Sequence, residues 1–527
     1  MKIKLRRCLS LFICLIIASC VIPAAYADNA NKSYVSILEN IGIIDNGYKL
    51  TDEAVTRAQF IRMIVNVLCD EVNTYEGNIP FDDVSVVDEN YNHIRTAYEY
   101  GIISGNGKGK FNPDSAIKYD EAVKIAVDLL GYKDYAVIEG GYPYGYLNTA
   151  NEIKLTKSVS SNGGLISAAS AARLIYNALH IETQTVEANG DVYLISKGRK
   201  SLMSQTMDLY CVKGILTANE FTGLYDIDGI GKSGIAIGDF KANIFNSLDA
   251  EKYIGYDVEC YYRSDGDSDT VLAVIPTSKN NVTEILAEDF LGFTGSEINY
   301  LESDKERRIK LDSELFVIFN GRIKDDYEET TFDINEGYIT IIDNDDDGNA
   351  DVINVLSYED YIIADIDSEE KIIYDSYGKT LDLSMEESFK SVVISDENGD
   401  EVPFSKLEKN QVLSVVKDDE ELYIRAVLSS KSVSGKISGL YTSEDNHIVS
   451  IDGEDYILSD NIGEDYLVDY KTGENGDFLL NAFGKIIYFK KGTVEAGEVG
   501  LPIERDDLVL PCGIYGRWES NWCNTDN

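Results

Sequence analysis

The chain has 527 residues, of which 44% are hydrophobic and 10% aromatic, a composition that predicts several folded domains and excludes a disordered chain. It carries 92 acidic against 47 basic residues, so it lacks the basic surface that nucleic-acid binding requires. The excess of acid favours solubility and leaves calcium open as a ligand.

The N-terminus has the three parts of a secretory signal peptide. Four basic residues in the first seven positions precede an apolar run over residues 9–21, and the small-residue exit Ala25-Tyr26-Ala27 follows. We therefore expect residues 1–27 to be a signal peptide and the secreted chain to begin near Asp28. Ile17-Ala18-Ser19-Cys20 also resembles a lipobox, so lipidation at Cys20 is the alternative. No later run is long and apolar enough to predict a transmembrane helix in the mature chain.

Three helices are predicted between residues 33 and 182, because one hydrophobic spacing occurs three times. After residues 56–59, 118–121 and 167–170, apolar residues follow the i, i+3, i+4, i+7, i+8 spacing of an amphipathic helix. These residues are Phe60, Met63, Ile64, Val67 and Leu68; Ala122, Ile125, Ala126, Leu129 and Leu130; and Ala171, Leu174, Ile175, Ala178 and Leu179. The pattern predicts three repeats, at about 33–72, 78–133 and 138–182, in a helical domain over residues 28–190.

Short motifs surround these helices. Thr56-Arg57-Ala58-Gln59 has a capping-box pattern, and Gly42 and Gly101 are placed to end shorter upstream helices in a left-handed conformation. The second repeat opens with Phe81-Asp82-Asp83-Val84. It continues with a loop that contains Gly105, Gly107, Gly109, Phe111 and Pro113. In this order the motifs resemble the S-layer homology domain, whose Thr-Arg-Ala-Glu signature is similar to residues 56–59. The third repeat is degenerate, and the resemblance covers under a third of the chain.

The resemblance implies a pseudo-trimeric bundle whose grooves between repeats bind an anionic, often pyruvylated, secondary cell wall polysaccharide. Arg57 is the main candidate contact, because a guanidinium pairs with a carboxylate and a helix start favours negative charge through its N–H groups and dipole. The lesser candidates are Gly42, Lys118, Tyr119, Gly105, Gly107 and Phe111. Tyr119 and Ala168 replace the signature arginine in the second and third repeats, so the alternative is that the repeats serve chiefly as a folding unit.

From about residue 195 the pattern changes to alternating and β-branched runs separated by Asn-Gly, Asp-Gly and acidic turns. These runs predict antiparallel strands and hairpins in sandwich-like or barrel-like modules. We expect a β module over 195–290, a central β-rich domain over 291–430, a second β module over 431–495 and a tail over 496–527. The predicted fold class is therefore multidomain, with an α-helical N-terminal bundle followed by all-β modules.

One acidic segment has the spacing of a calcium loop. Between residues 343 and 351, carboxylates alternate and Gly348 occupies the sixth position, which suits an oxygen-ligated cation. The candidate ligands are Asp343, Asp345, Asp347 and Asp351. Loop position twelve is Asn354 rather than glutamate, so a solvated acidic hairpin turn is an equal alternative.

The cysteines and histidines suggest little chemistry. Cys211 with Cys260, and Cys512 with Cys523, are the disulfide pairings considered, although spacing does not decide connectivity. Only three histidines occur, widely separated, which disfavours zinc sites and histidine-based triads. We therefore expect a non-catalytic wall-associated surface protein, whose partners are the wall polysaccharide and, as a further candidate, itself or other surface-layer proteins. A wall-anchored hydrolase and a ligand-binding adhesin are the alternatives.

Overall fold

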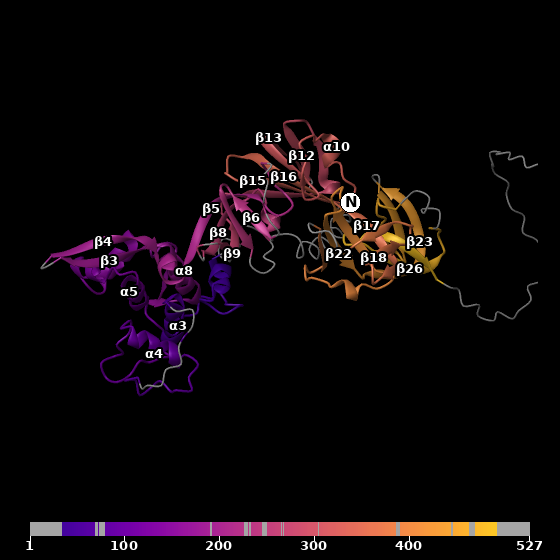
Figure 1. Cartoon of the computed structure of the whole chain (residues 1–527). Coiled ribbons are helices and arrows are strands. Elements are labelled where there is room, and N and C mark those ends of the chain that lie inside the picture. Colours follow the sequence, from indigo (N-terminus) through magenta and orange to yellow (C-terminus); the bar gives the residue numbers. More distant parts are fainter. Residues whose placement is uncertain are drawn as a thin grey trace, which may run out of the picture.

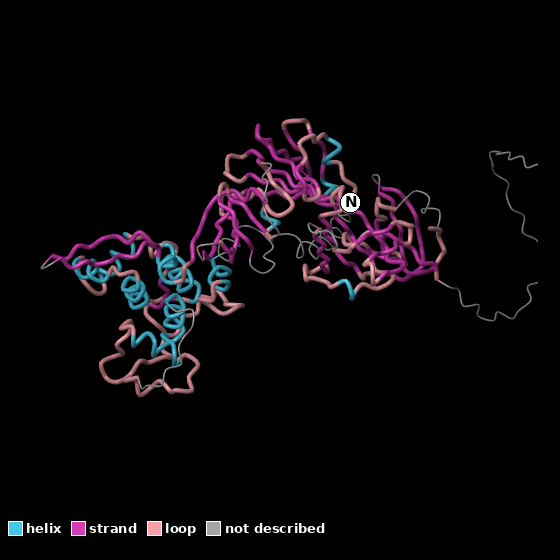
Figure 2. The backbone as a smooth tube through the Cα atoms, in the orientation of Figure 1, coloured by secondary structure: helices cyan, strands magenta, loops and turns pink. Residues whose placement is uncertain are grey.

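The computed structural model describes residues 34–68, 72, 79–189, 192–225, 230, 233–244, 250–264, 266, 268–303, 305–385, 390–443, 446–462 and 470–492. The predicted signal peptide, the lipobox, the C-terminal tail and the Cys512–Cys523 pairing lie outside these residues. The described modules follow one another in an elongated, bent arrangement, with the helices at one end and the sheets after them (Figures 1 and 2). The described helices include none long and apolar enough to cross a membrane.

The helical region is built on the three predicted amphipathic helices. These are α3 (Arg57–Leu68), α5 (Tyr119–Leu129) and α8 (Ala168–His180), and each buries its apolar face in one shared core. Shorter helices lie between them: α4 (Tyr91–Glu99), α6 (Lys133–Ile138) and α7 (Tyr144–Glu152). Phe60, Ile64, Ala126 and Leu174 are all fully buried, as the 3.6-residue periodicity predicts.

The segments before α3, α5 and α8 pair with one another in a closed ring. Thr56 bridges to Ala116, Lys118 to Leu165 and Ala54 to Ser167. The same segments satisfy the first amide of each helix. Arg57 N donates to Ser115 O at 2.9 Å, Tyr119 N to Gly164 O at 3.0 Å and Ala168 N to Glu53 O at 2.9 Å. Because the first N–H groups of a helix have no partner within it, these bonds hold the three helix starts around one centre.

A hairpin and a closed barrel follow the helices. The hairpin consists of β3 (Glu182–Asn189) and β4 (Val192–Ser201), and α9 (Leu202–Thr206) leads into the barrel. The barrel strands are β5 (Leu209–Ala218), β6 (Gly234–Ile237), β7 (Phe240–Ile244), β8 (Asp257–Ser264) and β9 (Asp269–Pro276), closed in the order β5-β6-β7-β9-β8. The hairpin extends beyond the helices, while the barrel lies between them and the later sheets (Figure 1).

Three further sheets complete the described chain. The first contains β10 (Asn281–Leu286), β11 (Phe290–Phe293), β12 (Glu297–Glu302), β13 (Lys305–Phe319), β14 (Arg322–Ile323), β15 (Gly337–Asp343) and β16 (Asn349–Ser357), with the short α10 (Glu329–Phe332). The second contains β17 (Glu359–Asp367), β18 (Ile372–Asp375), β19 (Thr380–Asp382), β20 (Ser391–Asp396), β21 (Val412–Lys417) and β22 (Tyr423–Ser429). The third contains β23 (Ser432–Ser443), β24 (Asn446–Ile451), β25 (Glu454–Ile457), β26 (Asn475–Leu480) and β27 (Ile486–Lys491).

The expectation of purely antiparallel modules is wrong at three strand pairs. β7 pairs parallel to β9, β13 to β16 and β20 to β22. Each parallel pair is joined by a chain segment that contains at least one further strand, which provides the return path that a parallel pair requires. The predicted domain boundaries near 195, 291 and 431 remain predictions.

Two buried carboxylates lie where the last three sheets meet. Asn481 Nδ2 donates to Glu336 Oε2 at 2.6 Å and to Asp360 Oδ2 at 2.9 Å. Asp360 also accepts from the hydroxyl of Ser414 at 2.6 Å. Glu336 Oε1 has no hydrogen-bond partner among the described residues, although Lys485 Nζ lies 3.6 Å away. Two carboxylates therefore face one ammonium, and a buried unbalanced charge is costly.

Burial, followed by the nearby charge of Asp360, raises the pKa of Glu336 to about 7. A carboxyl whose pKa is higher in the folded chain contributes stability below its unfolded pKa, and this contribution is lost as the pH rises through about 7. The free energy of unfolding of the wild type is therefore expected to fall between about pH 5 and pH 8, and in Glu336→Gln this fall is expected to be smaller. Urea denaturation at both pH values measures this, with the exposed Glu408→Gln as the control. Equal pH dependence in the wild type and Glu336→Gln would contradict it.

Candidate functional site

Arg57 is the first residue of α3, and its guanidinium contacts Phe111 of the glycine-rich loop and Glu121 of α5. Nε donates to the carbonyl oxygen of Phe111 at 3.0 Å, and Nη1 donates to Glu121 Oε2, also at 3.0 Å. The guanidinium carbon lies 4.9 Å from the centre of the Phe111 ring, a cation–π distance. The Arg57 side chain is 20% exposed, and Nη2 has no protein acceptor in the described part of the chain. Arg57 is therefore a positioned, partly exposed cation.

The backbone at the start of α3 is not a free anion site. Arg57 N donates to Ser115 O and Ala58 N donates to Pro113 O at 3.0 Å, while Gln59 N donates to the Thr56 hydroxyl at 3.1 Å. The expected capping box is complete, because Gln59 Oε1 accepts from Thr56 N. Since these amides are already paired within the protein, the guanidinium is the donor that remains for an anion at this helix start.

The glycine-rich loop holds Arg57 in place through Phe111. Phe111 is 1% exposed and packs on Phe81 at 5.7 Å between ring centres, so its ring belongs to the core and the Arg57 guanidinium covers it. Asp83 fixes the backbone there, accepting from Phe111 N at 2.9 Å and from Asn112 N at 2.8 Å. Desolvation of Asp83 acts to raise its pKa, but these two amides, the amide of Asp83 itself and the charge of Lys110 together lower the pKa.

The loop glycines have distinct roles. Gly105 and Gly107 both adopt positive φ, at 68° and 74°. A Cβ on Gly105 would lie 2.5 Å from Cε1 of Phe81, whereas one on Gly107 would meet nothing within 4 Å. Gly105 is thus required both by its backbone conformation and by close packing, and Gly107 by its backbone conformation alone.

The start of α5 carries different side chains from the start of α3. Lys118 is exposed and Tyr119 is half-buried. The Tyr142 hydroxyl donates to Asp120 Oδ2 at 2.5 Å, which ties the turn before α7 to this helix. Tyr142 and Tyr144 are 49% and 75% exposed, so this turn presents aromatic surface.

The remaining predicted residues lie elsewhere. Gly42 has φ of 75° in an exposed turn, and its carbonyl accepts from Asn66 Nδ2 at 3.4 Å, near the end of α3 opposite to Arg57. At the start of α8, the backbone oxygen of Ala168 accepts from the Tyr48 hydroxyl at 3.2 Å. The structure therefore brings Arg57 and the glycine-rich loop together, but it does not bring Gly42 to them.

Sequence reasoning did not propose Glu121, the ion-pair partner of Arg57, or Tyr142, the partner of Asp120, as site residues. For Glu121 the sequence does contain a signal. Glu121 follows Tyr119 in the place that corresponds to Gln59 after Arg57.

The predicted calcium loop is the turn between β15 and β16. One carboxylate oxygen from each of Asp343, Asp345 and Asp347 lies within 4.8 Å of the others, while Asp351 is outside this group. The same carboxylates accept turn amides: Asp343 accepts from Asp346 N at 2.7 Å and from Gly348 N at 2.9 Å. This donor set is compatible with calcium and is also that of a hydrogen-bonded acidic turn, so calcium binding stays a prediction.

The pairing of Cys211 with Cys260 is wrong, because both thiols are free. In the antiparallel register of β5 and β8, Cys211 lies opposite Tyr261 and Cys260 lies opposite Val212. Side chains of neighbouring strand positions point to opposite faces of the sheet. The two thiols are therefore on opposite sides of the barrel wall.

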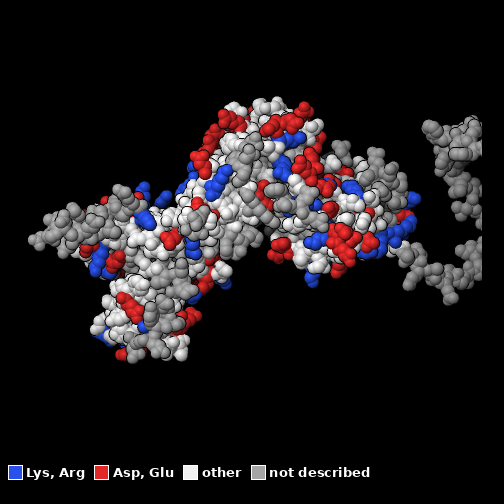
Figure 3. Space-filling model, viewed as in Figure 1, with Lys and Arg blue, Asp and Glu red and all other residues white. Residues whose placement is uncertain are grey.

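Charge on the remaining surface is mixed. On the face shown in Figure 3, Lys and Arg are interspersed with Asp and Glu, and acidic side chains gather over the sheets after the barrel. Such a surface provides no continuous basic track along which a polyanion would bind.

We expect Gly105→Ala to lower the melting temperature more than Gly107→Ala. Both substitutions place a Cβ at positive φ, at a cost of about 1 kcal/mol, and Gly105→Ala adds the clash with Phe81. Thermal unfolding followed by circular dichroism measures the difference between the two variants. Equal destabilisation would show that the Phe81 contact does not constrain the loop.

A family model for the S-layer homology domain matches residues 80–123, which run from the Phe81 motif through the glycine-rich loop into α5. The chain is 25% identical over 466 residues to a cell surface protein of Thermoanaerobacter kivui, covering 83% of this chain and 54% of that protein. It is 22% identical over 475 residues to the middle cell wall protein of Brevibacillus brevis, covering 78% of this chain and 44% of that protein.

An amylopullulanase of Thermoanaerobacterium thermosulfurigenes is 36% identical over only 104 residues, which are 19% of this chain and 5% of that enzyme. This enzyme shares the S-layer homology region alone, whereas the relatives matched over most of the chain have no catalytic name. The chain spans about half the length of these longer-matching relatives. The chain therefore contains an S-layer homology domain and is a cell-surface protein similar to surface-layer and cell wall proteins.

Proposed function

We propose that this protein is exported and anchored non-covalently to an anionic secondary cell wall polysaccharide, and that it presents its β modules outward without catalytic activity. The observation that carries the proposal is the partly exposed guanidinium of Arg57, held by Glu121 of α5, a residue within the S-layer homology match over residues 80–123. A carboxylate on the polymer, such as that of a pyruvate substituent, matches the planar donor geometry of this group.

The three helix starts support an arrangement of three S-layer homology units. Their segments bridge in a ring, and each helix start is hydrogen-bonded to the segment of the next unit. The start of α3 combines the guanidinium of Arg57 with a paired acid, Glu121. The start of α5 offers Lys118 and the exposed ring of Tyr142, which suit a weaker ionic contact and stacking on a sugar ring.

Glu121 has two opposing effects in the proposed site. Its carboxylate orients Arg57, but it also occupies Nη1 and places a negative charge beside the position of an anionic ligand. The whole chain has a formal net charge of −45, which repels a polyanion at long range. Recognition therefore relies on short-range contacts to the guanidinium, with Phe111 keeping Arg57 in place.

Arg57→Gln is expected to weaken binding of the mature chain to cell wall sacculi about tenfold or more, because a charge-assisted hydrogen bond contributes about 1.5–3 kcal/mol. Co-sedimentation across a range of protein concentrations measures the change. Arg62→Gln is the matched control, since Arg62 lies on the same helix in an exposed ion pair with Asp45. Binding that persists after the polysaccharide is removed from the sacculi, or an unchanged affinity of Arg57→Gln, would refute the proposed anchor.

Glu121→Gln is expected to strengthen binding to the same sacculi, by about threefold to tenfold. The amide oxygen of glutamine still accepts from Nη1, but the negative charge that competes with the ligand is gone. The same assay tests this, with Asp120→Asn as a neighbouring charge removal. A loss of binding in Glu121→Gln would instead make Glu121 a required part of the site.

A further inference from the structure

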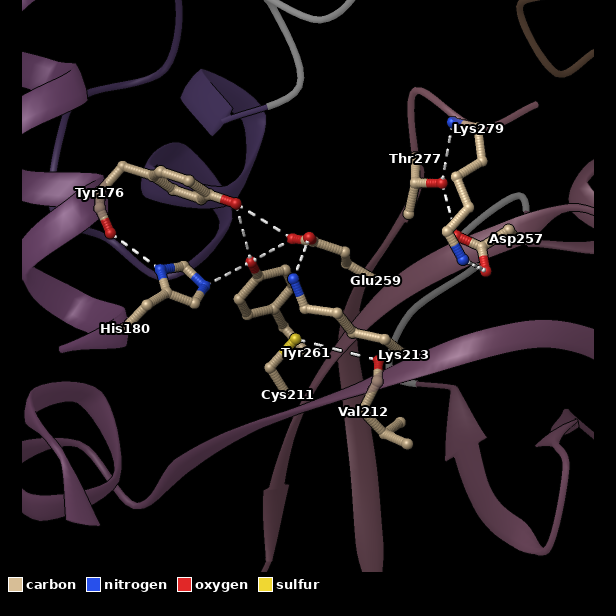
Figure 4. Close-up of polar contacts among 10 residues, drawn as sticks. All are labelled: Tyr176, His180, Cys211, Val212, Lys213, Asp257, Glu259, Tyr261, Thr277 and Lys279. Atoms are coloured by element: carbon tan, nitrogen blue, oxygen red, sulfur yellow. Dashed lines mark hydrogen bonds and ion pairs between the residues drawn. The ribbon is translucent and has the colours of Figure 1, made fainter. Parts of the chain in front are cut away.

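Four side chains with metal-binding donor atoms meet where the helical region contacts the barrel. Helix α8 contributes Tyr176 and His180, which are four residues apart and therefore share one helix face. Strand β8 contributes Glu259 and Tyr261, which are two residues apart and share one strand face. Figure 4 shows the two helix side chains pointing at the two strand side chains. These four residues form the joint cluster.

The donor atoms of the joint cluster have the spacing of metal ligands. Tyr176 Oη, Tyr261 Oη and Glu259 Oε2 form a triangle with sides of 2.9, 3.0 and 3.2 Å. His180 Nε2 lies 2.7 Å from Tyr261 Oη. In an octahedral site with bonds of about 2.0 Å, neighbouring ligand atoms lie about 2.8 Å apart. The triangle therefore has nearly the size of one face of an octahedral site, with the imidazole nitrogen beside it.

The contacts around the joint cluster are those that usually orient metal ligands. A metal-binding histidine typically donates its other N–H to a carbonyl, and a metal-binding carboxylate is itself hydrogen-bonded. His180 Nδ1 lies 2.8 Å from the carbonyl oxygen of Tyr176, which only accepts, so Nε2 is the nitrogen aimed at the cluster. Lys213 pairs with Glu259 Oε1, the carboxylate oxygen outside the triangle. Both kinds of supporting contact are therefore present.

The joint cluster lies at the edge of the hydrophobic core. Tyr261 is fully buried, in the same apolar cluster as Leu174 of α8. On the other side, the side chains of Glu259 and Lys213 are 18% and 59% exposed. An ion therefore has access past Lys213, while the apolar wall strengthens its attraction to the buried donors.

The hydrogens of the joint cluster indicate the charge of a matching ion. Nε2 of protonated His180 donates to Tyr261, and the hydroxyls of Tyr261 and Tyr176 both donate to Glu259. One trivalent ion that displaces these three hydrogens as protons leaves the net charge of the cluster unchanged, so no additional charge is buried. Phenolate and carboxylate oxygens are hard donors, which suit a hard, highly charged ion.

We propose that the joint cluster binds one ferric ion, with Tyr176, His180, Glu259 and Tyr261 as its ligands. The tyrosines bind as phenolates, and the displaced protons leave to solvent. Because two ligands come from α8 and two from β8, the ion cross-links the helical region to the barrel and stabilises their contact. The site shares no residue with the proposed polysaccharide contact at Arg57 and does not depend on it.

Titration of the chelator-treated mature chain with ferric nitrilotriacetate tests the proposal, because iron bound by a phenolate absorbs visible light through charge transfer. We expect a band that saturates at one ion per chain in the wild type and in the control Tyr441→Phe, which alters an exposed tyrosine far from the joint. The apparent affinity should fall about tenfold or more in Tyr261→Phe and in His180→Gln. No band in the wild type, or an equal band in Tyr261→Phe, would overturn the proposal, the latter as adventitious binding at other tyrosines.

Thermal unfolding of the wild type keeps the proposal testable if Tyr261→Phe does not fold. Ferric ion should raise the melting temperature of the helical region, followed by circular dichroism, by about 3 °C or more. It should not do so in Glu259→Gln, whose amide oxygen still accepts from Lys213 but whose charge is lost. An unchanged melting temperature in the wild type would overturn the proposal, whatever the variants do.

Cys211→Ser tests the choice of ligands. The Cys211 thiol comes within 4.8 Å of the donor atoms of His180 and Glu259, but a thiolate is a soft donor and is not among the proposed ligands. Ferric binding should therefore be unchanged in Cys211→Ser. Loss of binding in Cys211→Ser, with full binding in Tyr261→Phe, would overturn the proposal in favour of a thiolate site. Binding to sacculi is measured in parallel, and its loss or retention bears on Arg57 and not on the iron site.

Discussion

The helical region depends on the pairing of three short segments that precede its main helices. A helix start leaves amides without partners, and here each of α3, α5 and α8 donates to a carbonyl of a segment that belongs to a different part of the chain. The consequence is that no helix start is complete without its neighbour. The placement of Arg57 follows from this, because the segment that supplies Ser115 and Pro113 to α3 also carries Phe111, against which the guanidinium packs.

The same constraint changes the chemistry that a helix start usually offers. Free first-turn amides bind anions, but the ring uses them internally, so an anion must be recognised by side chains. Arg57 is suited to that task because its stem and ring contact are buried while one edge stays accessible. Glu121 orients the guanidinium through its ion pair. In the proposed site the same carboxylate would compete with an anionic ligand.

Local pattern was sufficient to predict the helices, the capping box at Thr56 and the change to β structure, because these depend on neighbours within a few residues. It was insufficient where distant parts of the chain meet. Glu121 is 64 residues from Arg57. Phe111 was a candidate contact, but its ring packs on Phe81 in the core, and the parallel pairing of β13 with β16 depends on how the intervening chain returns. Spacing could not decide whether Cys211 pairs with Cys260, whereas strand register places them on opposite faces.

The ring of segments also determines how mechanical load would pass through the molecule. A pull on the outer sheets reaches the helical region through β5 and α8, and the link between Ala54 and Ser167 carries it to the segment that starts α3. Force therefore arrives beside Arg57 through backbone hydrogen bonds that must break together rather than one after another. A closed ring of this kind resists separation from either end. A pull on the sheets would therefore act on an ionic contact at Arg57 and on the whole helical region together.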